Sequence, residues 1–175
     1  QLIIQNYREA QLIHQNFLGA SGERVREFLE EVKSLIELEL PTAEGWQTTI
    51  DDNLGESYRG LNIFRSDWSG ISLGLKGNSK IIGDQVFYGI CAARSTWDRS
   101  EMEKLIASFR GIESGFRQDH WWPFYQLVDL FNGEEGIERM CEKKDWEILV
   151  PGMASLVINL AKQCKEPLTQ IPRLA

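Results

Sequence analysis

The sequence has little of the chemistry that metal sites and covalent catalysis need. Only two histidines, His14 and His120, occur in 175 residues, and Cys91, Cys141 and Cys164 lie far apart. No two cysteines have the spacing of a zinc site, so structural zinc and zinc-dependent hydrolysis are disfavoured. His14 lies on an apolar helical stripe, where a packed core histidine is the usual case. We therefore expect no cofactor and no metal, and we expect free thiols in a reducing cytoplasm.

Other absences narrow the class of protein further. No apolar run approaches the roughly 18–20 residues that a membrane-spanning helix needs. Neither a GxSxG nucleophile elbow nor a GxxxxGK[ST] phosphate loop occurs. The net charge is −7 with no basic stripe, which argues mildly against nucleic-acid binding. The chain begins at Gln1 without a signal sequence, so we expect a cytoplasmic protein whose natural chain has residues upstream.

Two short strings have the Glu-x-Lys spacing that metal-dependent nucleases place on a catalytic strand. They are Glu31-Val32-Lys33 and Glu142-Lys143-Lys144. Both fall in helical patterns rather than on strands, and so short a string recurs by chance in a chain with 26% charged residues. The sequence therefore predicts no catalytic residue.

What the chain does have is an ordinary globular composition with many aromatics. Apolar residues make up 42% of the chain, with six tryptophans and eight phenylalanines. We expect one domain over residues 1–175 with an aromatic-rich core.

Helical spacing dominates residues 1–40. Ile3, Tyr7, Ala10, His14 and Phe17 recur at intervals of three and four, and a second stripe follows the GASG break at 19–22. The second stripe contains Val25, Phe28, Leu29, Val32, Leu35 and Ile36. The two helices could form a hairpin or fuse into one long bent helix.

The period changes to two between residues 46 and 93. Strands are predicted at 46–50, 58–65, 70–76 and 85–93, with turn-rich segments between them. Such short connections favour antiparallel pairing, because parallel strands need a long crossover.

Residues 98–166 are predicted to form a helix capped by Asp98 or Ser100, a strand at 122–131, a turn at 132–136 and two more helices. Pro151 either kinks the last helix or marks its first turn, and residues 167–175 are expected to be a tail. The fold class predicted is α+β, an antiparallel meander of four to five strands with helices packed on one face.

The stretch QDHWWPFYQ at 118–126 is the strongest candidate for a binding site. Strict alternation would turn Trp122 and Phe124 to one face and Trp121 and Tyr125 to the other. We name as candidate binding residues His120, Trp121, Trp122, Tyr125 and Arg94.

Two segments carry a family resemblance. Phe87-Tyr88-Gly89-Ile90 is followed by a helix and then by Trp121-Trp122-Pro123-Phe124-Tyr125. In this order they resemble the C-terminal accessory region of bacterial PD-(D/E)XK nuclease superfamily proteins of the defence and mobile-element type. The catalytic strands of that family have no counterpart here, so no nuclease residue is carried over. The resemblance implies sensing of a partner, a nucleic acid or an effector.

Three functions are left open by the sequence. The first is a non-catalytic interaction domain with a protein partner or a second copy of itself. The second is a small-molecule-binding protein or unrecognised enzyme with a pocket near His120 and Trp121. The third is nucleic-acid binding through aromatic stacking, which the charge does not favour.

Overall fold

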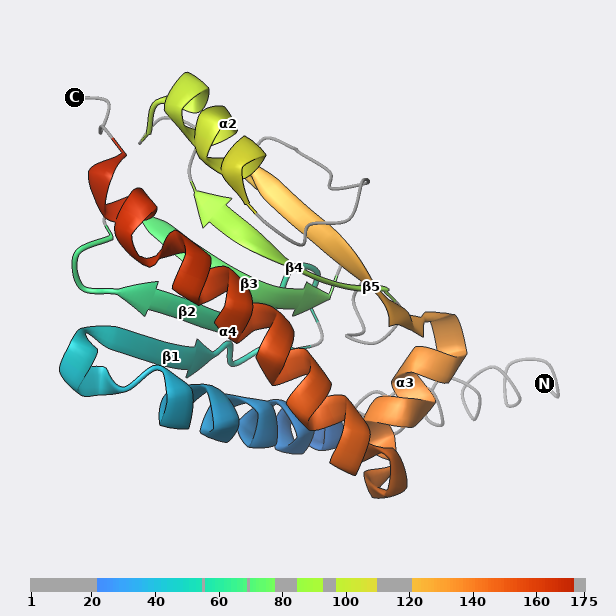
Figure 1. Cartoon of the computed structure of the whole chain (residues 1–175). Helices are drawn as coiled ribbons and strands as arrows, with labels where there is room; N and C mark the ends of the chain where they lie inside the picture. Colours follow the sequence, from blue (N-terminus) through green and yellow to red (C-terminus); the bar gives the residue numbers. More distant parts are fainter. Residues whose placement is uncertain are drawn as a thin grey trace, which may run out of the picture.

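The structure is a computed structural model that describes residues 22–54, 56–68, 70–77, 85–92, 97–109 and 121–171 of the chain. Figure 1 shows one antiparallel sheet with helices packed against it. The strands are β1 (Trp46–Ile50), β2 (Gly60–Arg65), β3 (Ile71–Gly77), β4 (Gln85–Ala92) and β5 (Phe124–Asn132). The helices are an N-terminal helix at 22–39, α2 (Arg99–Ser108), α3 (Gly133–Cys141) and α4 (Trp146–Gln170).

The strands pair in chain order, β1-β2-β3-β4-β5, and every pairing is antiparallel. The register places Leu61 opposite Leu75 and Leu73 opposite Ile90. Residues that face each other across two strands point to the same side of the sheet, so these apolar side chains form one buried face. The predicted α+β class and the antiparallel meander are confirmed.

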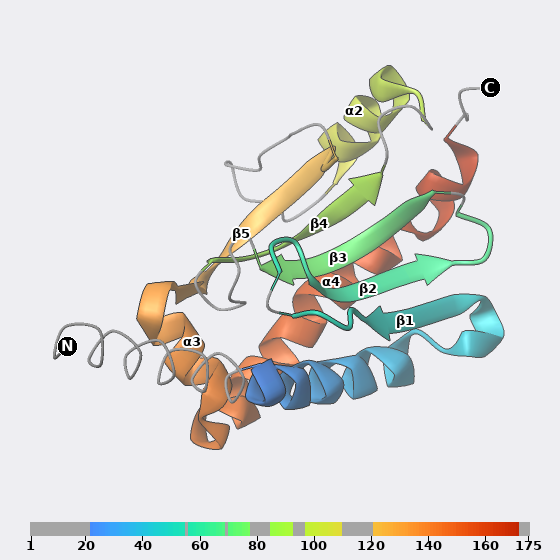
Figure 2. The same cartoon turned by 180° about the vertical axis from the view of Figure 1, so that it is seen from behind.

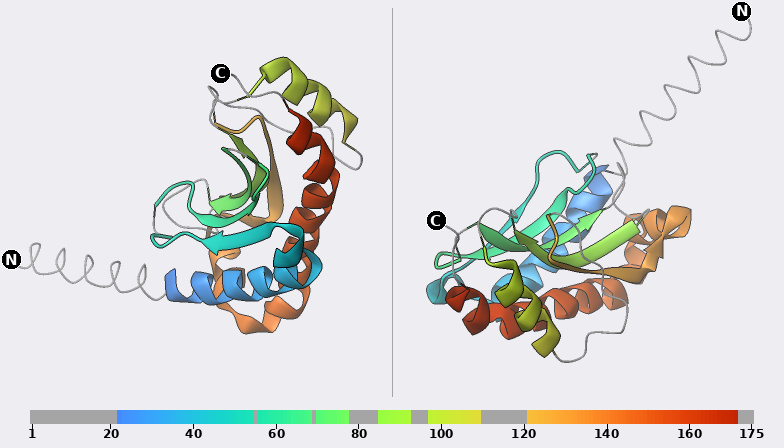
Figure 3. Two further views of the ribbon diagram at one scale, coloured as in Figure 1. Left: turned by 90° about the vertical axis from the view of Figure 1, so that its left-hand side faces the viewer. Right: turned by 90° about the horizontal axis from the view of Figure 1, so that it is seen from above.

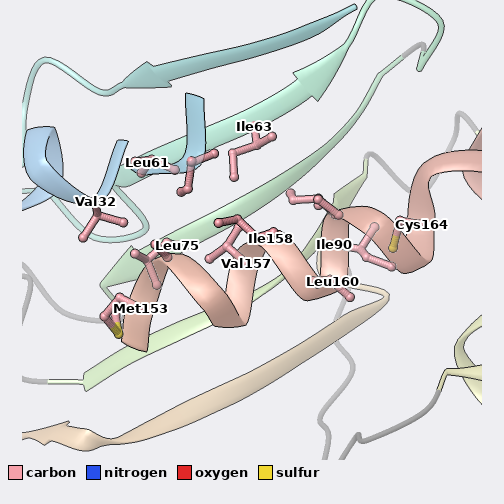
Figure 4. Close-up of a cluster of buried hydrophobic side chains, with 14 of the residues drawn as sticks. Val32, Leu61, Ile63, Leu75, Ile90, Met153, Val157, Ile158, Leu160 and Cys164 are labelled. Carbon is pink, nitrogen blue, oxygen red and sulfur yellow. The ribbon is translucent and has the colours of Figure 1, made fainter. Parts of the chain in front are cut away.

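Helix α4 covers that apolar face. Its inward stripe recurs every three or four residues and meets the strand side chains in Figure 4. The stripe consists of Leu149, Met153, Val157, Leu160, Cys164 and Leu168, all buried. Burial of each Leu, Val or Met of this stripe contributes about 1.5–3 kcal/mol to folding. Figure 2 shows the opposite face of the sheet, with α4 behind it.

The N-terminal helix lies beside β1, as the left view of Figure 3 shows, and its side chains join the same core. The predicted stripe is buried except for the half-buried Leu35, and the Phe28 ring meets Trp146 edge-on at 5.5 Å between centroids. Glu27 pairs with Lys143 just before the start of α4, and Glu39 pairs with Lys162 farther along. The two helices therefore begin side by side and run in the same general direction.

Three details differ from the sequence-based predictions. The predicted turn at 132–136 is mostly helical, since α3 begins at Gly133. Helix α4 continues past Pro167 to Gln170, into the predicted tail. Pro151 lies in the second turn of α4, so it removes one backbone hydrogen bond but stays near the helix start.

Of the two residues predicted to cap α2, the cap is Asp98, whose Oδ1 accepts a hydrogen bond of 3.0 Å from the Glu101 amide.

The helix predicted over residues 3–17 lies outside the described residues, as does the GASG break before Gly22.

Candidate functional site

Four large apolar or aromatic side chains are exposed among the described residues. Leu38 and Ile148 are 78% and 80% exposed and belong to the N-terminal helix and α4. Tyr58 and Trp121 are 51% and 58% exposed and belong to segments that precede strands. Exposed apolar side chains can belong to interaction surfaces, so these two regions are the candidate sites.

A groove of about 340 Å³ separates the N-terminal helix from α4. Its apolar lining comes from Leu35 and Leu38 on one wall and from Pro151, Ala154 and Ile158 on the other. The outward positions of α4 next to it are small: Gly152 has open space where a side chain would be, and Ser155 lines the groove. Small residues on one helix leave the groove open while the larger side chains beneath it fill the core.

Four polar residues, Glu39, Ser155, Asn159 and Lys162, also line this groove. Glu39 and Lys162 form an ion pair of 2.9 Å between the two helices. Farther along α4, the Lys165 ammonium lies 2.7 Å from Glu44 and holds the pKa of that carboxyl below its usual value. Both pairs are exposed, so they orient the helices more than they stabilise them.

The opposite face of the sheet holds a buried ion pair. Lys76 is only 5% exposed, and its Nζ donates to Asp51 Oδ2 at 2.6 Å. The same oxygen accepts a hydrogen bond of 2.9 Å from the Gly60 amide, and Oδ1 accepts one of 3.0 Å from Asn62. Three donors thus converge on one carboxylate, which accounts for its placement inside the fold.

The pKa directions of the two partners show opposing effects. Burial has the largest effect on the pKa of Lys76 and lowers it. The hydrogen bond and the charge of Asp51 act in the opposite direction and raise it, but the net shift is downward. Burial alone would raise the pKa of Asp51, but the bonds from Lys76, Gly60 and Asn62 together lower it. The three donors that lower the pKa of Asp51 favour its ionised form, and the Lys76 Nζ lies 2.6 Å from that carboxylate. This arrangement suits a structural ion pair better than a nucleophilic amine, which must be neutral.

An aromatic cluster lies on the same side of the sheet as Lys76. The ring of Phe87 contacts Trp122, Tyr125 and Tyr58 edge-on, with centroids 4.8, 5.3 and 6.3 Å away. Trp122 lies over Gly74, where a Cβ atom would come within 2.8 Å of its ring. The absence of a side chain at Gly74 is therefore what lets Trp122 lie on this face.

This cluster corrects the predicted alternation of the WWPFY segment. Trp122 lies on the side of Tyr125 and Phe87, whereas Phe124 is buried in the main core and pairs with Ile90. The reason is that β5 begins only at Phe124, and the bent backbone at 121–123 does not keep a two-residue period.

The candidate binding residues have different environments. Trp121 is exposed, Trp122 is buried and Tyr125 is half-buried, while His120 and Arg94 lie outside the described residues. Sequence reasoning missed the pairing of Asp51 with Lys76, because the two lie 25 positions apart. The only signal was that Lys76 falls in the polar phase of the best alternating strand.

The residues considered for other chemistry form local contacts. Lys33 pairs with Glu30 and Glu37 on its own helix, and Lys144 pairs with Glu142 two residues before it, so the lysine of each Glu-x-Lys string has a local acidic partner. Within the part of the chain that the structure describes, no three acidic, His or Cys side chains gather to hold a metal ion.

The cysteines have no disulfide partners. Cys91 and Cys141 are half-buried, and burial raises the pKa of the fully buried Cys164. A thiol in that environment is unreactive, because its thiolate is disfavoured.

Across the described ranges, no helix combines the length and the apolarity needed to cross a lipid bilayer. Comparisons of this chain with family models, with curated proteins and with solved structures found no match. The function proposed below accordingly rests on the geometry of the two surfaces.

Proposed function

We propose that this chain is a non-catalytic interaction domain that binds a protein partner at the groove between its N-terminal helix and α4. The observation that carries the proposal is that Leu38 and Ile148, the most exposed of the large apolar side chains described, belong to the two helices that form the groove. Leu38 lines the groove itself, and Ile148 lies one turn before Pro151 on α4. Burial of these two side chains by a partner would contribute favourably to binding.

The chemistry of the groove supports a protein rather than a small polar ligand. Five of the nine residues that line it are apolar, and grooves that combine apolar contacts with a few polar groups are typical of helix-binding sites. The resemblance to accessory regions of nuclease-superfamily proteins supports the same reading. A role beside a larger bacterial defence or mobile-element protein is part of this proposal.

The experiment is site-specific photocrosslinking in cells that express the chain. A crosslinking residue at position 38 or 148 should give a discrete crosslinked species. The matched control is Gln47, an exposed position on β1 at the other side of the sheet. The proposal would be contradicted if position 47 gave as much crosslinked product as positions 38 and 148, or if those two positions gave none.

A second candidate function is binding of a small molecule beside Trp121. It is favoured by the exposure of Trp121 next to the buried Trp122 and the half-buried Tyr125. Aromatic side chains at a partly open position are common in ligand sites. A thermal-shift screen tests it: a compound that stabilises the parent chain but not Trp121→Ala would support this function. A screen in which every hit acts equally on both proteins would remove it.

A further inference from the structure

We propose that the partner at the helical groove is the same surface of a second copy of this chain, related by a two-fold axis. The inference rests on the proposed function and names its partner. A two-fold contact joins one patch to itself, so that patch must carry both a projection and the hollow that receives it. Here both occur together. Leu38 and Ile148 project into solvent, and the hollow lined by Leu35, Pro151 and Ile158 lies between their helices.

The direction of the axis follows from how the two helices lie. They begin side by side, with Phe28 against Trp146, and run in the same general direction. An axis running along the helices therefore lays the N-terminal helix of each copy over α4 of the other. An axis across them would instead lay each helix over its own counterpart. In the first arrangement Leu38 meets the wall formed by Pro151 and Ser155 of the second copy.

Charge selects the axis along the helices. The N-terminal helix at 22–39 carries six acidic and three basic residues, whereas α4 carries two of each. Within one copy, glutamates of the N-terminal segment already pair with lysines on and just before α4: Glu27 with Lys143, Glu39 with Lys162 and Glu44 with Lys165.

An axis along the helices places the acidic helix of one copy beside α4 of the other, whose acidic and basic residues balance. An axis across them would place two acidic helices together, where like charges repel. These charges are exposed, so they set the orientation, while burial of Leu38 and Ile148 supplies most of the affinity.

The primary test is sedimentation velocity of the full chain over a wide range of concentration. The wild-type chain should dimerise in a concentration-dependent way. Leu38→Glu and Ile148→Glu should each raise the dimer dissociation constant by about tenfold or more, as loss of a central apolar contact does. Both positions are exposed, so neither variant should lose its fold, and a far-UV circular dichroism spectrum checks this. Gln47→Glu is the matched control and should dimerise as the wild type does.

A mixing experiment tests the axis. Leu38→Glu and Ser155→Lys should each dimerise poorly alone, but a mixture of the two should form a heterodimer through the new pair of opposite charges. A mixture of Leu38→Glu with Leu38→Lys should not, because position 38 does not face itself. A heterodimer of Leu38→Glu with Leu38→Lys, and none of Leu38→Glu with Ser155→Lys, would overturn the arrangement.

A wild-type chain that stays monomeric at every concentration would overturn the inference. The proposed function would survive that result if position 38 still crosslinked to another protein. Dimerisation that neither glutamate variant weakens would equally contradict the inference, since the contact would then lie elsewhere.

Discussion

At the scale of single residues, Lys76 is the least expected feature of the fold. A buried ammonium is costly unless a carboxylate and further hydrogen bonds surround the pair. Asp51 supplies that carboxylate and is itself fixed by Gly60 and Asn62. The cluster ties the end of β1 to β2 and β3 on the face that α4 does not cover, so its main role is to hold the register of three strands.

Asp51→Ala should lower the free energy of unfolding by about 3–5 kcal/mol, because it leaves the Lys76 charge buried without a partner. The double variant Asp51→Ala/Lys76→Met should lose less than the single variant, since no unpaired charge remains. Urea denaturation of the three proteins measures both differences. A double variant as unstable as Asp51→Ala would show that the charge is not the cause.

The same pair predicts a pH dependence. The pKa of Asp51 is lower in the folded chain than its ordinary value of 3.8. Its stabilising effect is therefore fully present above pH 3.8 and is lost as the pH falls through the lowered folded pKa. The stability gap between the wild type and Asp51→Ala, measured by urea denaturation at a series of pH values, should shrink in that acidic range. A gap that stays constant or widens there would contradict the assignment.

At the scale of elements, the pairing of β4 with β5 depends on a glycine. A Cβ atom at Gly89 would collide with the backbone carbonyl of Phe124, which cannot move without separating the strands. Gly89→Ala should therefore destabilise the fold by about 1–3 kcal/mol, the usual cost of overpacking. Gly152→Ala is the control: it meets no atom within 4 Å and should stabilise α4 by up to about 1 kcal/mol. Thermal unfolding measures both, and equal effects would refute the argument.

Elements with a clean local period were predictable from the sequence. Alternation of Ile71, Leu73 and Leu75 located β3, and the apolar stripe from Val25 to Ile36 located the N-terminal helix. Local rules failed where tertiary contacts decide. Helix α4 continues past Pro167, and Leu168 is still buried against the core. The side chain of Trp122 lies over Gly74, on the face opposite to the one that strict strand alternation predicts.

The two candidate surfaces were less predictable. The groove exists only because two helices separated by more than 100 residues pack side by side with small residues on one of them. No local pattern encodes that. The WWPFY segment, in contrast, was singled out by composition alone, and its exposed member Trp121 keeps it as a candidate site.

At the scale of the whole molecule, the structure presents two unlike sides. One side carries the helices, the groove and the paired rim charges, and the other carries the sheet with Lys76, Asp51 and the aromatic cluster. On the sheet side, the described polar groups largely satisfy one another. Tyr58 on the sheet side is 51% exposed, whereas Leu38 and Ile148 on the helical side are 78% and 80% exposed. The difference between the two sides is the basis for placing the protein partner on the helices.

The most direct test of this central claim is protection from alkylation. Leu38→Cys and Tyr58→Cys each place a thiol at an exposed position, one on each side, and mass spectrometry of peptides separates them from the natural cysteines. At concentrations at which the chain associates, the thiol at position 38 should react with the alkylating reagent much more slowly than in the dilute chain. The thiol at position 58 should react at the same rate at both concentrations. Protection of position 58 with unchanged reactivity at position 38 would place the interaction on the sheet and contradict the account.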